Sequence, residues 1–499
     1  MKKHVAVIGS GFAGLAGAAC LAQQGFQVTV FEKNATIGGR AQQLIADGFI
    51  FDKGPSWYWM PEVFENFYQL FGHTASDFYE LTRLNPSYRV YFGKDDFADL
   101  PANLDAFLQL VESMERGAAT KLTRFLQDAA YKYQVGMNDF VFRPGLSILE
   151  FMELRLAKEA FKLNLFQSIS AYIRKSFSNP KLIQILEFPV LFLGAKPADT
   201  PAMYSLMNYA DIALGTWYPQ GGMFEIIKAM HSICVSQGVQ FRLNANVESI
   251  TMEKGLAKSI TVNGIAETVD ILLGTADYHH IDQHLLPKVY RSYSPKYWDT
   301  RKMSPSCLLF FVGLNKKVTH LLHHTLFFDT DFNAHLGEIY DQPSWPTNPL
   351  FYVSCTSKTD DTAAPAGGEN LFILIPVAVA LAENPETRAH YFNIVIQRME
   401  TLTGESIRPH IVYQSSYAHS DYMHDYNAFK GNAFGLANTL RQTAILKPSM
   451  RSSKVKNLFF AGQLTTPGPG VPPSLISGQV AAKEILKAYG STQQQIRVA

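Results

Sequence analysis

Residues 4–31 constrain the fold of this chain more than any other stretch. They contain no Asp, Glu, Lys or Arg, and two lysines precede them, a pattern compatible with a signal peptide or a nucleotide-binding unit. The β-branched run VAVIG predicts a buried strand, and FAGLAGAACLAQQG has the small and apolar spacing of a helix that ends at Gly25. A second strand, QVTVFE, ends in Glu32. Because the segment divides in this way, we expect a nucleotide-binding unit and no signal peptide.

The turn between the first strand and the helix matches the GxGxxG pattern. Gly9 permits the tight turn, Gly11 lets the backbone approach a pyrophosphate, and Gly14 lets the helix pack closely on the strand. The helix N-terminus offers unpaired N–H groups to the phosphates. Glu32 follows Gly14 by 18 residues and can accept hydrogen bonds from ribose hydroxyls. The order of these elements predicts a Rossmann-type domain that binds a dinucleotide.

The residues after Glu32 favour FAD over a nicotinamide cofactor. Gly38 and Gly39 precede Arg40, so the backbone can approach a ligand closely at a second place, with the positive charge of Arg40 beside it. This arrangement suits a diphosphate held between two loops. Read alone, GGR is also compatible with an ordinary turn, but its place directly behind the acidic residue favours the diphosphate.

Composition narrows the class of protein. Among 499 residues, 44 are basic and 43 acidic, so no nucleic-acid partner is expected. The four cysteines are scattered, which predicts a reducing compartment and neither disulfides nor a metal site. The adjacent histidine pairs are interpreted as structural. Aromatic residues make up 13% of the chain, which fits either a large apolar ligand or an aromatic-rich core.

From these motifs onward the chain resembles a known family. The combination of GxGxxG, Glu32, GGR and GFIFDKGPS is similar to the amine-oxidase-like FAD proteins, and specifically to the bacterial-type carotenoid desaturases, the phytoene desaturase family. The resemblance continues in GTWYPQGGM, RLNANVESI, GTADYHH, GNAFGLANTLRQTAILKP and NLFFAGQLTTPGPGVPPSLISGQVAAKEIL. Thr275 departs from the usual asparagine, and Thr466-Pro467-Gly468 departs from the usual His-Pro-Gly.

The resemblance implies that FAD is held by residues from several of these segments. Val247 resembles the valine that meets the adenine through its backbone, and Gly462 resembles the glycine that lets the backbone reach the flavin. The implied cofactor-binding residues are Gly9, Gly11, Phe12, Ala13, Gly14, Glu32, Lys33, Gly39, Arg40, Gly54, Pro55, Ser56, Val247, Thr275, Asp277, Leu436, Gly462, Val471 and Pro472.

The resemblance also implies an α/β (α+β) fold in which a discontinuous FAD-binding domain carries an inserted substrate domain with a mixed sheet and a helical, membrane-facing part. The predicted boundaries are 1–80, 215–300 and 430–499 for the FAD-binding domain, 81–214 and 301–429 for the substrate domain, and about 146–196 for the membrane-facing part.

Within that part, one apolar stripe recurs every four residues, which predicts a single amphipathic helix. The stripe consists of Phe161, Leu165, Ile169 and Ile173, and the basic residues around it are Arg155, Lys158, Lys162, Arg174 and Lys175, against Glu159. The pattern alone favours a packing helix with a solvated basic face. The resemblance favours contact with anionic membrane lipid, because a carotenoid is dissolved in the bilayer. We therefore expect a cytoplasmic protein attached peripherally to one leaflet, with no spanning helix.

The implied reaction is FAD-dependent desaturation, in which a C–H bond beside a polyene gives hydride to the flavin while a neighbouring carbon loses a proton. The substrate is either a 1'-hydroxylated carotenoid, desaturated at the 3,4 position, or a phytoene-type carotenoid, and overall similarity favours the first. Oxygen or a membrane quinone would accept the electrons.

No catalytic residue is assigned. Glu150 and Glu153 are candidates for relaying the proton, with helix capping as the alternative. Trp57, Tyr58 and Trp59 are predicted to line a tunnel or to pack in the core. A flavin-dependent carotenoid isomerase, a carotenoid-binding flavoprotein without turnover and an amine oxidase are the alternative functions.

Overall fold

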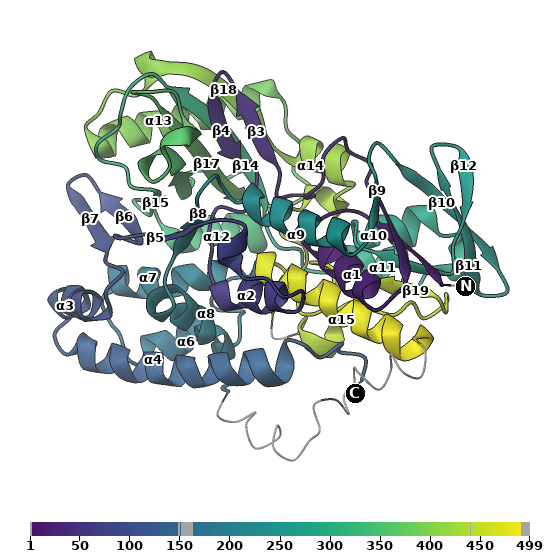
Figure 1. Cartoon of the computed structure of the whole chain (residues 1–499). Coiled ribbons are helices and arrows are strands. Elements are labelled where there is room, and N and C mark those ends of the chain that lie inside the picture. Colours follow the sequence, from purple (N-terminus) through teal and green to yellow (C-terminus); the bar gives the residue numbers. More distant parts are fainter. Residues whose placement is uncertain (1, 148–149, 151–162, 440, 491–499) are drawn as a thin grey trace.

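The structure is a computed structural model of the 499-residue chain, and it describes residues 2–147, 150, 163–439 and 441–490. Two large sheets organise these residues (Figure 1).

The first sheet has five strands, all paired in parallel in the order β19, β13, β1, β2, β9. The predicted strand, helix and strand are confirmed, since α1 (Phe12–Gln23) connects β1 to β2, and β2 ends directly before Glu32. The strands are β1 (His4–Ile8), β2 (Gln27–Phe31), β9 (Gln240–Arg242), β13 (Ile271–Gly274) and β19 (Leu458–Phe460).

Helices α1 and α15 (Val471–Tyr489) lie side by side against this sheet (Figure 1). They approach closely because each carries a glycine at the contact: a Cβ on Gly478 would lie 2.2 Å from the Ala13 carbonyl oxygen and 2.9 Å from the Gly17 nitrogen. Both helices follow parallel strands, so both N-termini lie at the carboxyl edge of the sheet, where ligands of such folds bind.

The second sheet is mixed and has seven strands in the order β18, β14, β17, β16, β15, β6, β7, of which β15 and β6 pair in parallel. Its strands are β6 (Tyr88–Gly93), β7 (Asp96–Leu100), β14 (Ser306–Leu314), β15 (His324–Phe327), β16 (Phe351–Ser354), β17 (Glu369–Val377) and β18 (Ile411–Tyr417).

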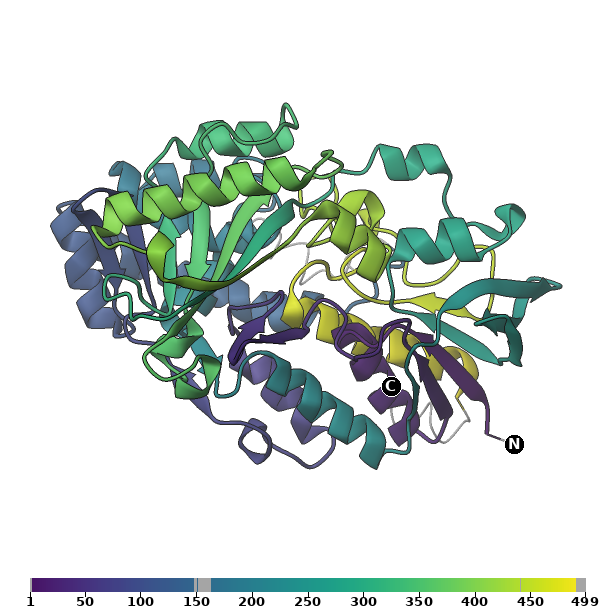
Figure 2. The same ribbon diagram turned by 90° about the horizontal axis from the view of Figure 1, so that it is seen from above.

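Strand β14 is buried along its whole length because its two faces meet different layers. Leu308, Phe310 and Val312 belong to the same core cluster as residues of α13 (Pro385–Thr403), which lies over the sheet in Figure 2. The alternate side chains of Cys307 and Leu309 point to the opposite face, where the cavity described below lies.

The remaining elements are three small sheets and the other helices. Three smaller sheets are formed by β3 (Gln43–Ala46) with β4 (Phe49–Asp52), by β5 (Leu81–Arg83) with β8 (Trp217–Pro219), and by β10 (Val247–Glu253), β11 (Leu256–Val262) and β12 (Ile265–Thr268). The other helices are α2 (Pro61–Gln69), α3 (Leu104–Met114), α4 (Ala118–Val135), α6 (Ile169–Arg174), α7 (Pro180–Leu191), α8 (Leu206–Asn208), α9 (Phe224–Ser236), α10 (Tyr278–His280), α11 (Pro295–Asp299), α12 (Phe332–Tyr340) and α14 (His419–Tyr426).

The insertion differs from the single amphipathic helix predicted over residues 161–173. Asn164 adopts a left-handed conformation with φ of +51°, and the Ser168 side chain caps a new helix, α6, by accepting a hydrogen bond from the Ala171 N–H. Ile169 and Ile173 are fully buried in the core, so they do not face a membrane. Six residues of this prediction and of the proton-relay hypothesis lie outside the described residues: Glu153, Arg155, Lys158, Glu159, Phe161 and Lys162.

Among the helices that the structure describes, none is long and apolar enough to cross a membrane.

Candidate active site and cofactor cavity

One cavity of about 430 Å³ joins the carboxyl edge of the five-stranded sheet to the inner face of the seven-stranded sheet. It has two parts of different chemistry. We call the part lined by residues within 8–56, 245–285 and 417–474 the dinucleotide half, and the part lined by residues within 57–60, 188–207 and 305–376 the apolar half.

The three glycines of the first turn have separate roles. A Cβ on Gly9, whose φ is +103°, would lie 2.9 Å from the Ala276 nitrogen, and a Cβ on Gly14 would lie 2.2 Å from the Gly9 carbonyl oxygen. A Cβ on Gly11 would meet nothing closer than 4.0 Å. Gly9 and Gly14 are therefore required by backbone packing, whereas Gly11 leaves room beside the uncapped N-terminus of α1 for a phosphate.

Glu32 is 5% exposed and already accepts three hydrogen bonds. One carboxylate oxygen accepts from the Ser10 N–H at 3.0 Å and the Ser10 hydroxyl at 2.7 Å, and the other accepts from the Asn34 N–H at 2.9 Å. A carboxylate has about four acceptor positions. One position thus remains for a ribose hydroxyl, and the carboxylate also fixes the glycine turn.

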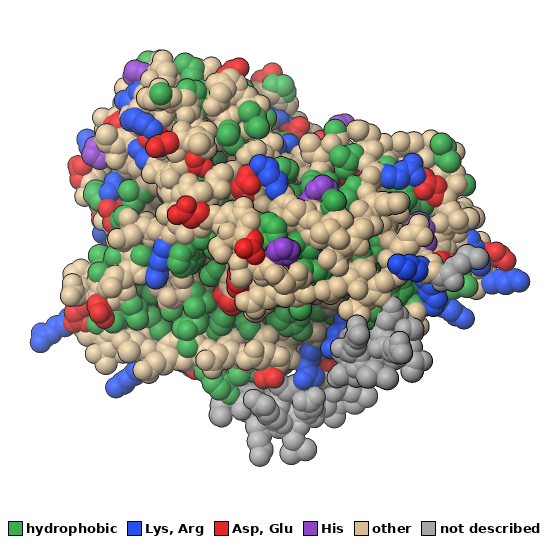
Figure 3. Space-filling model, viewed as in Figure 1, with side chains coloured by type: hydrophobic (Ala, Val, Ile, Leu, Met, Phe, Trp, Pro, Cys, Tyr) green, Lys and Arg blue, Asp and Glu red, His purple; other side chains and the backbone are tan. Residues whose placement is uncertain are grey.

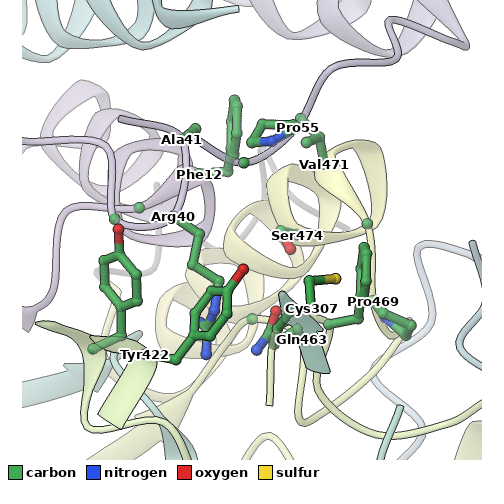
Figure 4. Close-up of a pocket in the computed structure, with 18 of the residues that line it drawn as sticks. Phe12, Arg40, Ala41, Pro55, Cys307, Tyr422, Gln463, Pro469, Val471 and Ser474 are labelled. Carbon is green, nitrogen blue, oxygen red and sulfur yellow. The ribbon is translucent and has the colours of Figure 1, made fainter. Parts of the chain in front are cut away.

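Arg40 supplies unused donors to the dinucleotide half, where Figure 4 shows its side chain beside Tyr422 and Gln463. One guanidinium nitrogen donates to the Asn432 carbonyl at 3.3 Å, whereas Nε is buried without a partner. The nearby Asp277 carboxylate caps α10 and accepts from the Phe429 N–H at 3.1 Å. Burial raises the pKa of Asp277, and the positive charge of Arg40 opposes that rise. A half-buried guanidinium in the wall of the cavity fits a bound diphosphate.

The N-terminus of α15 closes the same half of the cavity. Gly470, with φ of +108°, precedes the helix without a side-chain cap, and Figure 4 shows Val471 next to Pro55 and Pro469 near Cys307. The Ser477 hydroxyl accepts from the Gly462 N–H at 2.9 Å and donates to the Thr466 carbonyl at 2.7 Å, which fixes the turn before the helix. Two uncapped helix N-termini, a buried acid and a half-buried guanidinium together fit FAD.

Most of the predicted cofactor residues line this cavity. The exceptions are Gly14, which packs behind the turn, and Leu436, which is fully buried in a separate core cluster and bridges to Met303. Four further lining residues were not predicted from the sequence, namely Tyr422, Tyr426, Gln463 and Ser474, although the last two lie within the C-terminal signature.

Two further predictions concern residues beside the cofactor motifs. Trp57 and Trp59 line the cavity, whereas Tyr58 is fully buried in the core. Glu150 does not line it, because its carboxylate accepts hydrogen bonds from the N–H groups of residues 145–147 at 2.8–3.0 Å. The Glu150 carboxylate is therefore engaged by the backbone of residues 145–147, outside the cavity.

The apolar half is neutral. None of its described lining residues is Asp, Glu, Lys or Arg. The His335 ring accepts from the Leu350 N–H at 3.0 Å and donates to the Pro376 carbonyl at 2.9 Å, and burial lowers its pKa to about 4. Trp57 stacks on His324 with 4.0 Å between ring centroids, and the Tyr352 hydroxyl bonds to the His324 ring at 2.7 Å.

Burial also holds the pKa of His324 well below its ordinary value, and it raises the pKa of the Cys307 thiol, which Figure 4 shows pointing into the cavity. Both groups are therefore uncharged near neutral pH. The arrangement suits a long, apolar and uncharged ligand.

Known proteins resemble this chain over nearly its full length. Residues 12–486 match the model of the family described as flavin containing amine oxidoreductase. A carotenoid 3,4-desaturase from Haloarcula japonica is 40% identical over 97% of this chain and 98% of its own length. A zeta-carotene-forming phytoene desaturase from Myxococcus xanthus is 30% identical over 97% of this chain and 94% of its own.

The solved structure of a putrescine oxidase bound to putrescine superposes with a TM-score of 0.61 at 13% identity, covering 97% of this chain and 99% of the oxidase. The predicted fold class is thereby confirmed.

Proposed function

The chain belongs to the flavin containing amine oxidoreductase family, and within it to the carotenoid desaturases, and we propose that it introduces the 3,4 double bond of a 1'-hydroxylated carotenoid. It is an FAD-dependent oxidoreductase that acts on CH–CH groups. The higher identity to the 3,4-desaturase, 40% against 30% for the phytoene desaturase, supports this position over phytoene-type desaturation.

The observation that carries the proposal is the distribution of charge along the cavity. All lining residues of formal charge that the structure describes lie in the dinucleotide half: Glu32, Lys33, Arg40, Lys53, Asp277 and Asp425. An ammonium substrate in the apolar half would lose its hydration without gaining a carboxylate partner, which is strongly unfavourable. A polyene loses no polar hydration there, so the site favours a carotenoid over an amine.

The residues of the apolar half act by binding and by excluding water. Bound FAD supplies the hydride acceptor. Trp57, Trp59 and Tyr352 line the wall, where aromatic faces stabilise positive charge that develops on a polyene. The Nδ1 atom of His335 already accepts a hydrogen bond from Leu350, so it has no free lone pair for the departing proton. The chain thus contributes mainly position and a dry environment.

We assign FAD binding to the residues predicted from the sequence, with Gly14 acting through backbone packing and Leu436 replaced by the cavity-lining Tyr422, Tyr426 and Gln463. We also retain the proposed domain boundaries. In support, the strands of the five-stranded sheet come from residues 4–31, 240–274 and 458–460, and those of the seven-stranded sheet from 88–100 and 306–417.

Peripheral contact with membrane lipid is a further part of the proposal. Four large apolar side chains are exposed near the insertion, namely Phe142, Leu146, Phe166 and Leu446, with Phe166 85% exposed. Gly145 lies next to Ala444, the Tyr204 hydroxyl bonds to Thr443 at 3.2 Å, and the Ala202 N–H donates to the Gln167 carbonyl at 2.7 Å. These contacts bring the segments that carry the four side chains to one region of the surface.

Apolar side chains at such a surface favour insertion into a leaflet. Figure 3 shows hydrophobic side chains gathered over the helical block on the face it draws.

Oxygen or a membrane quinone would reoxidise the flavin.

A substrate comparison tests the proposal. FAD-loaded protein is incubated in air with liposomes that contain 1'-hydroxy-γ-carotene, γ-carotene or phytoene, and products are identified by mass. We expect the hydroxylated substrate to react fastest and to lose two mass units. Faster reaction of phytoene would refute the 3,4 assignment, and products of unchanged mass would favour an isomerase.

A further inference from the structure

Lys447 is a buried cation that the reaction described above does not use. It is 4% exposed, and its Nζ atom has no hydrogen-bond partner in the structure. Asn438, 3% exposed, places a second unpartnered polar atom, Oδ1, in the same region. Both side chains converge on Gly468, because a Cβ at that glycine would lie 3.2 Å from Lys447 Nζ and 3.0 Å from Asn438 Oδ1.

An isolated amine in such a place is costly. Removing a charged group from water without a partner is strongly unfavourable, and buried polar groups are normally hydrogen-bonded. Burial alone lowers the pKa of Lys447 to about 7, and no carboxylate pairs with it among the residues that the structure describes. A negative charge that arrives with a ligand would remove this cost.

The location of Lys447 indicates which ligand supplies that charge. Gly468 belongs to the turn of residues 466–470 that leads into α15, and Pro469 and Gly470 of this turn line the dinucleotide half of the cavity. Lys447 itself does not line the cavity, but its Nζ atom lies next to Gly468 of this turn. Arg40 and the N-terminus of α1 would already offer donors to the diphosphate, which leaves the charge of Lys447 for another anionic part of the cofactor.

We propose that Lys447 is a positioning residue that acts through the 466–470 turn to stabilise the reduced, anionic form of the bound flavin. The inference requires bound FAD, and it is independent of which substrate reduces the flavin. It assigns to this lysine a role in setting the reduction potential rather than in contacting substrate.

The midpoint potential of the FAD-loaded protein, measured by dye equilibration without carotenoid, tests the inference. In Lys447→Met we expect about a tenfold lower preference for reduced over oxidised flavin, which lowers a two-electron potential by about 30 mV. Lys447→Arg retains the charge and should retain the wild-type potential. Lys483→Met removes an exposed lysine from α15 and should leave the potential unchanged, because solvent screens that charge.

An unchanged potential in fully loaded Lys447→Met would overturn the inference. So would weaker binding of oxidised FAD with an unchanged potential, because the charge would then serve the diphosphate. If the methionine variant fails to fold, Lys447→Gln is subjected to the same criterion. Carotenoid turnover is not part of the measurement, so failure of the proposed function leaves this test intact.

Discussion

Replacing Glu32 by glutamine is expected to weaken FAD binding by about 10- to 150-fold. The carboxylate has one free acceptor position once its bonds to Ser10 and Asn34 are counted. A single hydrogen bond to a charged acceptor contributes about 1.5–3 kcal/mol, and about 1.4 kcal/mol corresponds to a factor of ten in affinity. The expected range follows from losing that one bond.

The same substitution has a local cost that is separate from FAD. A glutamine amide presents one acceptor and one donor, so its NH₂ group must face at least one of the backbone N–H groups of Ser10 and Asn34. One buried donor then lacks a partner, which lowers the free energy of unfolding of the apoprotein by about 1–3 kcal/mol. Denaturant unfolding of the wild-type and Glu32→Gln apoproteins measures this loss in the free energy of unfolding.

Calorimetric titration of apoprotein with FAD gives the affinity itself. Ser10→Ala is the matched control, because it removes one hydrogen bond to Glu32 but keeps the carboxylate, so FAD affinity should stay within about threefold of wild type. Equal dissociation constants for wild type and Glu32→Gln would refute the ribose assignment.

Three other perturbations test other parts of the account. Leu336→Glu places a carboxylate in the apolar half, so kcat/KM for carotenoid should fall by about 100-fold or more at unchanged FAD content. Leu336→Met should change kcat/KM by less than about threefold. Equal losses in both variants would refute carotenoid binding in the apolar half. Burial lowers the pKa of His335 to about 4 in the folded protein, against about 6.5 in the unfolded chain. Between these two pH values the unfolded chain binds one more proton at this residue than the folded protein does. The free energy of unfolding should therefore fall by about 3 kcal/mol from this group as pH drops from 6.5 to 4. Chemical denaturation across that range should show a shallower pH dependence in His335→Gln, and an identical slope would contradict the assignment. Phe166→Ser should reduce cosedimentation with liposomes by about tenfold. Val289→Ser is the control and should not reduce it, because Val289 is 76% exposed but lies outside the proposed lipid contact. Equal behaviour of the two variants would exclude Phe166 from that contact.

The nucleotide-binding unit was predictable because its determinants are local. Gly9, Gly14 and Glu32 have roles set by a single strand, turn and helix, and the structure gives each a steric or hydrogen-bonding reason. The resemblance extended the prediction to distant segments such as the turn before Val471. Leu436 was misassigned because a linear motif does not distinguish a cavity-lining residue from its buried neighbour.

The apolar half could not be derived from the sequence in the same way. Its wall depends on antiparallel pairing between β14 and β17, whose partners lie more than 50 residues apart along much of the ladder, as in Leu309 with Leu374. The run of buried residues in β14 indicates a strand but not which face meets the cavity. The single helix predicted over residues 161–173 was wrong because the prediction considered only the apolar spacing. Asn164 adopts a left-handed conformation and Ser168 caps a new helix, so the chain does not continue as one helix.

Anaerobic mixing of FAD-loaded protein with carotenoid-containing liposomes shows whether the bound flavin oxidises the carotenoid. The flavin absorbance is followed while the product is identified by mass. We expect the flavin to bleach and one product molecule, two mass units lighter than the substrate, to form for each flavin reduced. A flavin that stays oxidised while carotenoid is bound, or a product of unchanged mass formed only after prior flavin reduction, would contradict desaturation.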